Sequence, residues 1–234
     1  MNANLKLRYA RQIAIQEIGL NGQQNLLNGR VLVIGCGALG SMVAMQLAGA
    51  GIGKIGIADF DTVDISNLQR QFFFKTQETG QSKVEVLEKS IRSLNPDIEI
   101  TTYNGLITSK KAEEIFPYYD FIVDATDNPD SKQMTGVLSQ RHGLPCNIGG
   151  VRDFNGQVIT LLPKDPRFEE YIGNVPSDGF LPCSLSGVIG PAAALCASVQ
   201  ASEVIKYFTH SGILLSGRLL IFDLLKNTFH TFTI

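Results

Sequence analysis

The chain has 234 residues, of which 44% are hydrophobic and 18% charged, so it can bury the core of one large α/β domain or of two small ones. Its formal net charge of −2 argues against a nucleic-acid binder, which usually has a basic excess. No apolar run is long enough to cross a membrane, and residues 1–8 lack the apolar core of a secretion signal, so we expect a cytoplasmic protein.

The first elements that the sequence predicts are two short helices, over residues 7–18 and 21–27, with a break at Gly19. Residues 30–34 (RVLVI) then form an apolar run rich in β-branched residues, as expected of a buried parallel strand.

A glycine turn follows this strand. Gly35, Gly37 and Gly40 have the G-x-G-x-x-G spacing and precede a helical pattern. In such a unit the first glycine permits the tight turn, the second lets a phosphate approach the backbone, and the third lets helix and strand pack closely. A second apolar strand, over residues 54–58, ends at Asp59, about twenty residues further on, where an acidic residue binds ribose hydroxyls. A turn that serves packing alone stays open as an alternative.

The next segment combines a polar loop, over residues 61–71, with alternating helices and strands. Ser82 is a candidate cap for a helix that starts near Lys83 and ends at residues 95–96 (Asn-Pro). A half-covered strand over 98–103, a short helix over 109–115 and a buried strand over 120–124 follow. Asp127 and Asn128 then lie at the carboxyl end of a strand, where ligands bind in open α/β sheets.

The pattern changes after residue 150. Residues 151–162 alternate around Asn155-Gly156 and predict a hairpin with a tight turn there. A long connection rich in Pro, Gly and Ser occupies 163–186, an alanine-rich helix spans 191–208, and a closing hairpin covers 218–222 and 228–232. The predicted fold is α/β, with a Rossmann-like, mostly parallel sheet that is flanked by helices and extended by antiparallel strands in the C-terminal half.

Two cations and several polar groups near the glycine turn suggest that the nucleotide is ATP rather than a redox cofactor. Activating a carboxylate with ATP requires attack on the α-phosphorus and loss of pyrophosphate, so the protein must mainly position reactants and neutralise phosphate charge. Arg70 and Lys83 are the candidate phosphate clamps, and Asn67 could bond a phosphate or ribose oxygen. Asp127 is the candidate Mg²⁺ ligand.

Simpler roles for the same residues stay open. Lys83 could be a solvated residue in the first turn of its helix, and Arg70 could pair with Asp61 or Asp64 at the surface. Asp127 and Asn128 could cap the next helix, a role that metal binding need not exclude.

Six short motifs in one order give the chain a specific resemblance. They are Arg8-Tyr-x-Arg11-Gln12, Gly35-x-Gly37-x-Leu-Gly40, Asp59-x-Asp61, Asn67-Leu-x-Arg70-Gln71, Gly80-x-x-Lys83 and Thr126-Asp127-Asn128. Together they resemble the ThiF/MoeB/HesA family, bacterial relatives of ubiquitin-activating enzymes, over about residues 7–221.

The resemblance implies a function. Members adenylate the C-terminal glycine of a small ubiquitin-like sulfur-carrier protein (ThiS- or MoaD-like, ending in Gly-Gly) with ATP and Mg²⁺ and release pyrophosphate, as in thiamine-thiazole synthesis. It implies a homodimer in which Arg11 reaches into the partner's site. It also implies one adenylation domain over 1–234, with a nucleotide-binding half (1–150) and a carrier-binding half (151–234). The ATP contacts implied are Asp59, Asp61, Asn67, Arg70, Gln71 and Lys83, with the glycine turn, and Asp127 is the implied Mg²⁺ ligand.

The cysteines depart from the family pattern. Two C-x-x-C pairs usually hold zinc in thiamine- and molybdopterin-pathway members, but residues 163–174 contain no cysteine and the chain ends at Ile234, so we expect a shortened member without zinc. Cys36, Cys146 and Cys196 have the context of packing residues. Cys183 aligns with a cysteine that some relatives link covalently to the carrier, by a thioester or an acyl disulfide, although a packed loop cysteine is an equal alternative.

Three other functions fit the sequence less well. An NAD-dependent oxidoreductase would explain the glycine turn and Asp59 but not Arg70 and Lys83, and no catalytic His or Tyr pair follows. A binding module that has lost catalysis would not need the full set of cations and carboxylates. A related branch activates a carboxylate on modified tRNA, which the weak net charge fits less well.

Overall fold

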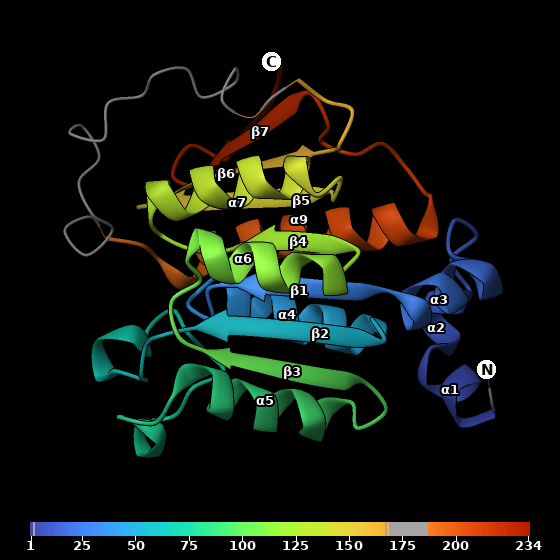
Figure 1. Ribbon diagram of the computed structural model, residues 1–234, viewed down its shortest axis with the longest axis horizontal. Coiled ribbons are helices and arrows are strands. Elements are labelled where there is room, and N and C mark those ends of the chain that lie inside the picture. The colour runs from blue at the N-terminus through green and yellow to red at the C-terminus, as the bar shows by residue number, and fades with distance from the viewer. Residues whose placement is uncertain (2, 167, 169–186) are drawn as a thin grey trace.

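The computed structural model describes residue 1, residues 3–166, residue 168 and residues 187–234. One eight-stranded sheet runs through it in the order β3-β2-β1-β4-β5-β6-β7-β8 (Figure 1). The strands are β1 (Arg30–Ile34), β2 (Lys54–Asp59), β3 (Glu99–Asn104), β4 (Phe121–Asp124), β5 (Cys146–Arg152), β6 (Asn155–Leu161), β7 (Arg218–Asp223) and β8 (Thr228–Thr233). Strands β1 to β5 are parallel, and β6, β7 and β8 add to them in antiparallel pairs, so the predicted fold class is confirmed.

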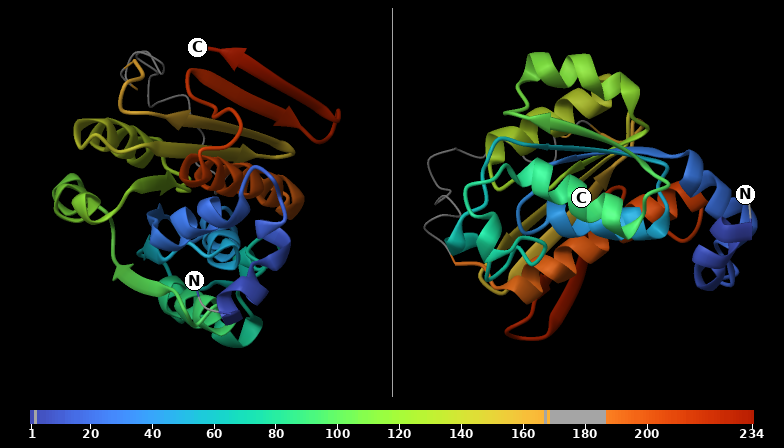
Figure 2. Two further views of the ribbon diagram at one scale, coloured as in Figure 1. Left: turned by 90° about the vertical axis from the view of Figure 1, so that its right-hand side faces the viewer. Right: turned by 90° about the horizontal axis from the view of Figure 1, so that it is seen from below.

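Helices cover both faces of the sheet (Figure 2). They are α1 (Ala3–Arg8), α2 (Ala10–Ile13), α3 (Gly19–Asn28), α4 (Gly40–Ala50), α5 (Lys83–Leu94), α6 (Ser109–Ile115), α7 (Pro129–Arg141) and α9 (Gly190–Thr209), with short 3₁₀ turns η1 (Ile65–Asn67), η2 (Thr76–Glu78) and η3 (Phe116–Tyr118). Helices α4, α5 and α9 pack on one face and α6 and α7 on the other. None of these helices has both the length and the apolar character needed to span a bilayer.

Two apolar cores result from the alternation of strand residues. Val31, Val33 and Ile57 face α4 and α9, whereas Leu32 and Ile122 face α6 and α7. The central strands are therefore buried on both sides, which explains why they read as continuous apolar runs.

The N-terminal helices differ from their prediction. The single helix expected over 7–18 is two short helices, and α2 ends at Ile13. Residues distant in sequence hold this segment in place. The Tyr9 hydroxyl accepts a 2.8 Å hydrogen bond from Asn95 Nδ2. The Tyr9 ring packs against Gly51, where an added Cβ would lie 2.5 Å from the ring. These tertiary contacts favour a bent path over a continuous helix.

The hairpin between β5 and β6 turns two residues earlier than predicted. Arg152 pairs with Asn155, so Asp153 and Phe154 form the loop, and Asp153 adopts a φ of +53°. Gly156 instead lies in β6, where an added Cβ would stand 2.2 Å from the Phe222 ring. Glycine is needed at this position because the Phe222 ring packs against its backbone, and not because the chain turns there.

Candidate functional site

The glycine turn joins β1 to α4 at the carboxyl edge of the parallel strands. Gly35 has a φ of +88°, which favours glycine, and a Cβ on Gly40 would lie 1.7 Å from the carbonyl oxygen of Gly35. A Cβ on Gly37 would meet only Gln71 Nε2, at 3.5 Å. Gly35 and Gly40 are thus required by the turn itself, whereas the side of Gly37 is open to a ligand.

Asp59 fastens the end of β2 to this turn. Its Oδ2 accepts a hydrogen bond from the backbone N–H of Cys36 at 2.6 Å, and its Oδ1 accepts one from the N–H of Asp61 at 2.9 Å. Carboxylate oxygens have two lone pairs each, so Asp59 can still accept hydrogen bonds from ribose hydroxyls. The predicted ribose acceptor therefore lies beside the predicted phosphate turn.

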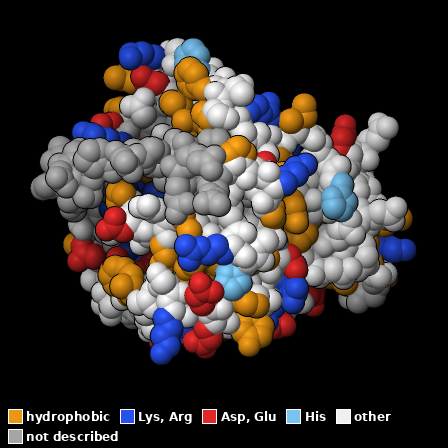
Figure 3. Space-filling view, turned by 45° about the horizontal axis from the view of Figure 1, so that its top comes forward, with side chains coloured by type: hydrophobic (Ala, Val, Ile, Leu, Met, Phe, Trp, Pro, Cys, Tyr) orange, Lys and Arg blue, Asp and Glu red, His pale blue; other side chains and the backbone are white. Residues whose placement is uncertain are grey.

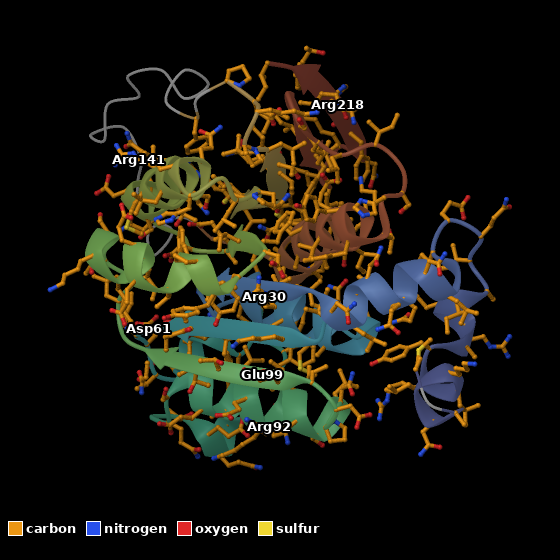
Figure 4. The ribbon with its side chains drawn as sticks, turned by 45° about the vertical axis from the view of Figure 1, so that its right-hand side comes forward. Arg30, Asp61, Arg92, Glu99, Arg141 and Arg218 are labelled. Carbon is orange, nitrogen blue, oxygen red and sulfur yellow. The ribbon has the colours of Figure 1, made fainter. Side chains whose placement is uncertain are left out.

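Lys83 lies below the surface, paired with Asp61. Its Nζ is 2.9 Å from Asp61 Oδ2; the Lys83 side chain is only 5% exposed, whereas that of Asp61 is 51% exposed. The solvated alternative for Lys83 is therefore wrong, because its side chain is buried and its backbone N–H donates to the Asp61 carbonyl, which holds the first turn of α5 against the loop after β2. Figure 4 labels Asp61 where the chain leaves β2, at the edge of the sheet that the glycine turn occupies. Ser82 precedes α5 as expected, but its side chain makes no capping hydrogen bond.

The loop after Asp61 is shaped by local hydrogen bonds. Asp64 Oδ1 accepts from the hydroxyl and the N–H of Ser66, at 2.6 and 2.8 Å, and these bonds lower the pKa of Asp64. Arg70 Nη1 donates to the carbonyl of Ser66 at 3.1 Å, and in the described chain it makes no ion pair with Asp61 or Asp64. The surface-pair alternative for Arg70 is therefore wrong.

Asn67 and Gln71 stand on the same loop. Asn67 is half-buried in η1, and its Nδ2 is 3.4 Å from Ser66 Oγ. Gln71 is buried beside Gly37, and its Oε1 has no hydrogen-bond partner among the described residues. Loop and turn thus face each other, as the sequence predicts for a nucleotide site.

Asp127 follows β4 on the neighbouring side of the turn. A Cβ on Gly35 would lie 2.9 Å from the carbonyl oxygen of Ala125, so the segment that leads to Asp127 passes close to the glycine turn. Asn128 caps α7, since its Oδ1 accepts from the N–H groups of Asp130 and Ser131, at 2.8 and 3.2 Å. Asn128 thus caps α7, as one of the open alternatives had it, and Asp127 beside it is exposed.

Two charged residues of this edge escaped the sequence analysis. Asp124, the last residue of β4, is fully buried, and its Oδ1 lies 3.2 Å from Lys132 Nζ on α7. Lys132 also donates to the carbonyl oxygens of Thr126, at 2.5 Å, and Gly149, at 2.6 Å. A lysine in the first turns of a helix is usually solvated, so only the position of α7 beside the end of β4 and the middle of β5 reveals this contact.

Arg11 lies at the opposite end of the sheet, on α2 (Figure 1). Helices α2 and α3 are both held to the end of α4: Gln12 Nε2 of α2 donates to the carbonyl of Ala50 at 2.9 Å, and Gln23 Nε2 of α3 does so at 3.0 Å. Since α4 starts at the glycine turn and rises 1.5 Å per residue, this end is about 15 Å from the turn. The structure therefore does not bring Arg11 to the glycine turn of its own chain.

The cysteines at positions 36, 146 and 196 are buried, as expected of packing residues, and desolvation raises the pKa of each thiol. Cys183 and the predicted connection around it lie outside the described residues. Within the described part of the chain, no three His, Cys, Asp or Glu side chains gather as a metal site.

Comparison with known proteins decides the family. A model of the ThiF family matches residues 9–234. The chain belongs to the ThiF family.

Two relatives of this chain have names that describe an activity. The chain is 37% identical over 233 residues to the Mycobacterium tuberculosis protein named "Probable adenylyltransferase/sulfurtransferase MoeZ", covering 97% of this chain and 59% of that protein. It is 33% identical over 234 residues to the "Sulfur carrier protein adenylyltransferase" of Thermus thermophilus, covering 97% and 86%. The chain thus spans less than two thirds of the first of these relatives.

The fold of this chain is also seen in a solved structure. The crystal structure of Escherichia coli MccB with ATP superposes with a TM-score of 0.84 over 99% of this chain and 72% of that chain, at 24% sequence identity. At this identity the likeness concerns the fold alone.

Proposed function

We propose that this ThiF-family chain binds ATP at the glycine turn and adenylates the C-terminal glycine carboxylate of a small ubiquitin-like sulfur-carrier protein. The observation on which the proposal rests most is the buried ammonium of Lys83, held by Asp61 at the carboxyl edge beside the glycine turn. A cation in this position offers charge to a nucleotide's phosphates, which a dinucleotide redox site does not need. The names of relatives at 33–37% identity agree with it.

The chemistry follows from the residues at this edge. A carboxylate oxygen of the carrier attacks the α-phosphorus, a new O–P bond forms, and the bond to the bridging oxygen breaks, so that pyrophosphate leaves and an acyl adenylate remains. Lys83 and Arg70 would neutralise the charge on the phosphates, and the N–H groups at the start of α4 would face the same anion. Asp59 would hold the ribose. Asp127 would bind Mg²⁺, which when bound neutralises further phosphate charge.

Arg11 enters the proposal only through a second copy of the chain. Because α2 is held at the far end of the sheet, Arg11 would have to act in a partner's site. A groove of about 390 Å³ next to this segment, lined by Ile15, Ile18, Ala201 and Ile205 among others, offers the apolar surface that a second copy could cover. A homodimer with a shared site accounts for both features.

Cys183 is proposed to act after adenylation. Its thiolate would attack the carbonyl carbon of the acyl adenylate, forming a C–S bond as AMP leaves, and the product would be a thioester; a persulfide in its place would give an acyl disulfide. A Cys183→Ala variant is expected to keep adenylation but to lose any reductant-sensitive conjugate on a gel.

The carrier and the compartment are further parts of the proposal. We favour a carrier of the thiamine-thiazole type or a related sulfur pathway, in the cytoplasm. Among the described residues on the face seen in Figure 3, Lys and Arg side chains are interspersed with Asp and Glu, a mixed pattern that suits a protein partner better than tRNA.

The direct test is carrier-dependent exchange of labelled pyrophosphate into ATP. A Gly-Gly-ended carrier is expected to support exchange, and the same carrier without its last glycine is the matched control. Exchange with neither carrier, while the protein is folded and binds Mg·ATP, would overturn the proposal. Tight NADH binding without ATP binding would favour the oxidoreductase alternative instead.

A further inference from the structure

The end of β4 and the middle of β5 are held by side chains from helices on the two faces of the sheet. On the α7 side, Lys132 Nζ contacts Asp124 Oδ1, the Thr126 carbonyl and the Gly149 carbonyl at 3.2, 2.5 and 2.6 Å. On the α9 side, Gln200 Nε2 donates to the backbone carbonyl of Asp124 at 2.9 Å. The two strands are parallel neighbours, and Gly149 directly follows the β5 residue that pairs with Asp124, so a few side chains fix the end of β4 to the middle of β5.

The three acceptors satisfy the ammonium of Lys132 fully. A lysine has three N–H donors, and each has an oxygen within hydrogen-bond distance. The side chain is 20% exposed and Asp124 is fully buried, so these bonds lie in a medium where they are less weakened by water. Asp124 Oδ1 in addition accepts from the N–H and hydroxyl of Thr126, at 3.0 and 2.8 Å.

The contact with Thr126 matters most for the site. The Thr126 carbonyl and the Asp127 N–H belong to one planar peptide unit. Anchoring this carbonyl therefore fixes the direction in which the backbone enters Asp127. Asn128 completes the anchoring on the other side, because its side chain caps α7.

We propose that Lys132 is a positioning residue that orients the Asp127 loop, and so presents the carboxylate of Asp127 to the metal-bound triphosphate. This inference rests on the proposed function for the role of Asp127, but the loop anchoring stands on the contacts alone. It also explains a buried charge pair that the adenylation chemistry does not use directly.

Three variants separate positioning from general stability. Lys132→Met removes the ammonium and Lys132→Arg keeps a cation. Asp124→Asn/Lys132→Met removes both charges and avoids an unpaired buried carboxylate if the single variant folds poorly. Lys54→Met is the matched control, because Lys54 is 26% exposed and pairs with Glu99 at 2.8 Å, at the start of β2 and away from the site.

The first readout is hydrogen exchange in the nucleotide-free protein. Lys132→Met and the double variant are expected to exchange amides in residues 125–128 about tenfold faster or more, the ratio that corresponds to losing one charge-assisted hydrogen bond. Lys132→Arg and Lys54→Met are expected to match the wild type. Exchange at wild-type rates in Lys132→Met or in the double variant would overturn the inference.

The second readout is calorimetry with two ligands. Lys132→Met is expected to bind Mg·ATP about 10- to 100-fold more weakly, as is usual when an outer contact of a metal ligand is lost, but to bind AMP without metal as the wild type does. Equal weakening of both ligands would overturn the inference. If Mg·ATP binding depends on Lys132 but no carrier supports pyrophosphate exchange, the proposed function fails and the role of Lys132 stands.

Discussion

The carboxylate of Asp59 accepts a 2.6 Å hydrogen bond from the backbone N–H of Cys36, the second residue of the glycine turn. Its other oxygen holds the N–H of Asp61, whose carboxylate in turn pairs with Lys83. One acidic residue thus links the glycine turn after β1 to the loop that holds the buried cation. These contacts within the protein hold the shape of the turn, and fixed groups of this kind are what electrostatic preorganisation requires.

Replacing Asp59 tests this link. Asp59→Ala leaves two backbone N–H groups without acceptors, and we expect a loss of about 1–3 kcal/mol in the free energy of unfolding together with weaker ATP binding. Asp59→Asn keeps one acceptor oxygen, so its unfolding free energy and its ATP affinity are expected to lie between those of the wild type and Asp59→Ala. Urea denaturation and calorimetry measure the effects; an unchanged unfolding free energy in Asp59→Ala would show that the contact is dispensable for the turn.

The glycines of the turn are expected to separate stability from binding. Gly40→Ala places a Cβ 1.7 Å from the Gly35 carbonyl and is expected to cost about 3 kcal/mol of stability. Gly37→Ala meets only Gln71 at 3.5 Å, so its stability is expected to change by less than about 0.5 kcal/mol. Its added methyl group nevertheless stands where a phosphate would approach, so ATP binding should weaken. Intact binding in a folded Gly37→Ala protein would place the phosphates elsewhere.

Mixing two inactive variants tests whether Arg11 acts in a partner's site. Arg11→Ala and Lys83→Met are each expected to abolish pyrophosphate exchange. In a dimer of one of each, one site has an intact Lys83 and receives Arg11 from its partner. Re-equilibrated equal mixtures are therefore expected to recover about a quarter of the wild-type activity. Mixtures that stay inactive while exchanging subunits would contradict action in trans.

The buried thiols predict how stability depends on pH. Desolvation raises the pKa of Cys196 to about 12, whereas an unfolded cysteine titrates near about 8.5. Between these values the unfolded chain loses a proton that the folded chain keeps, so stability is full below the unfolded pKa and falls as the pH rises. Each pH unit in this window costs about 1.4 kcal/mol. The unfolding free energy of the wild type is expected to fall more steeply than that of Cys196→Ala above about pH 9 under reducing conditions; equal slopes would refute the shift.

Sequence patterns predicted the bounds of helices and strands correctly where the local residue pattern agrees with the burial of the element in the fold. The strand Arg30–Ile34 and the helix Ser109–Ile115 have their predicted bounds, because apolar runs and helix signals match their burial. The turn predicted at Asn155-Gly156 was wrong. A side chain at Gly156 would clash with the Phe222 ring, which explains the glycine there. The turn instead includes Asp153, a residue type that tolerates a positive φ.

The candidate site divides in the same way. Glycine spacing and the carboxyl ends of strands placed Gly35, Asp59 and Asp127 at one edge without structural knowledge. Lys132 was missed because its role depends on α7 packing beside the end of β4 and the middle of β5, a tertiary relationship that no spacing in its own helix encodes. The sequence could not decide whether the Lys83 side chain is solvated, and the structure shows that it is buried beside Asp61.

The central proposal is attack on the α-phosphorus, and the fate of a labelled phosphate tests it most directly. The protein, Mg²⁺ and a Gly-Gly-ended carrier are incubated with ATP labelled at either the α- or the γ-phosphate, and the carrier is recovered under acid conditions. Label is expected on the carrier only from the α-position, and Lys83→Met is expected to abolish it. Transfer of the γ-label, or no transfer from either position by folded protein, would contradict adenylation.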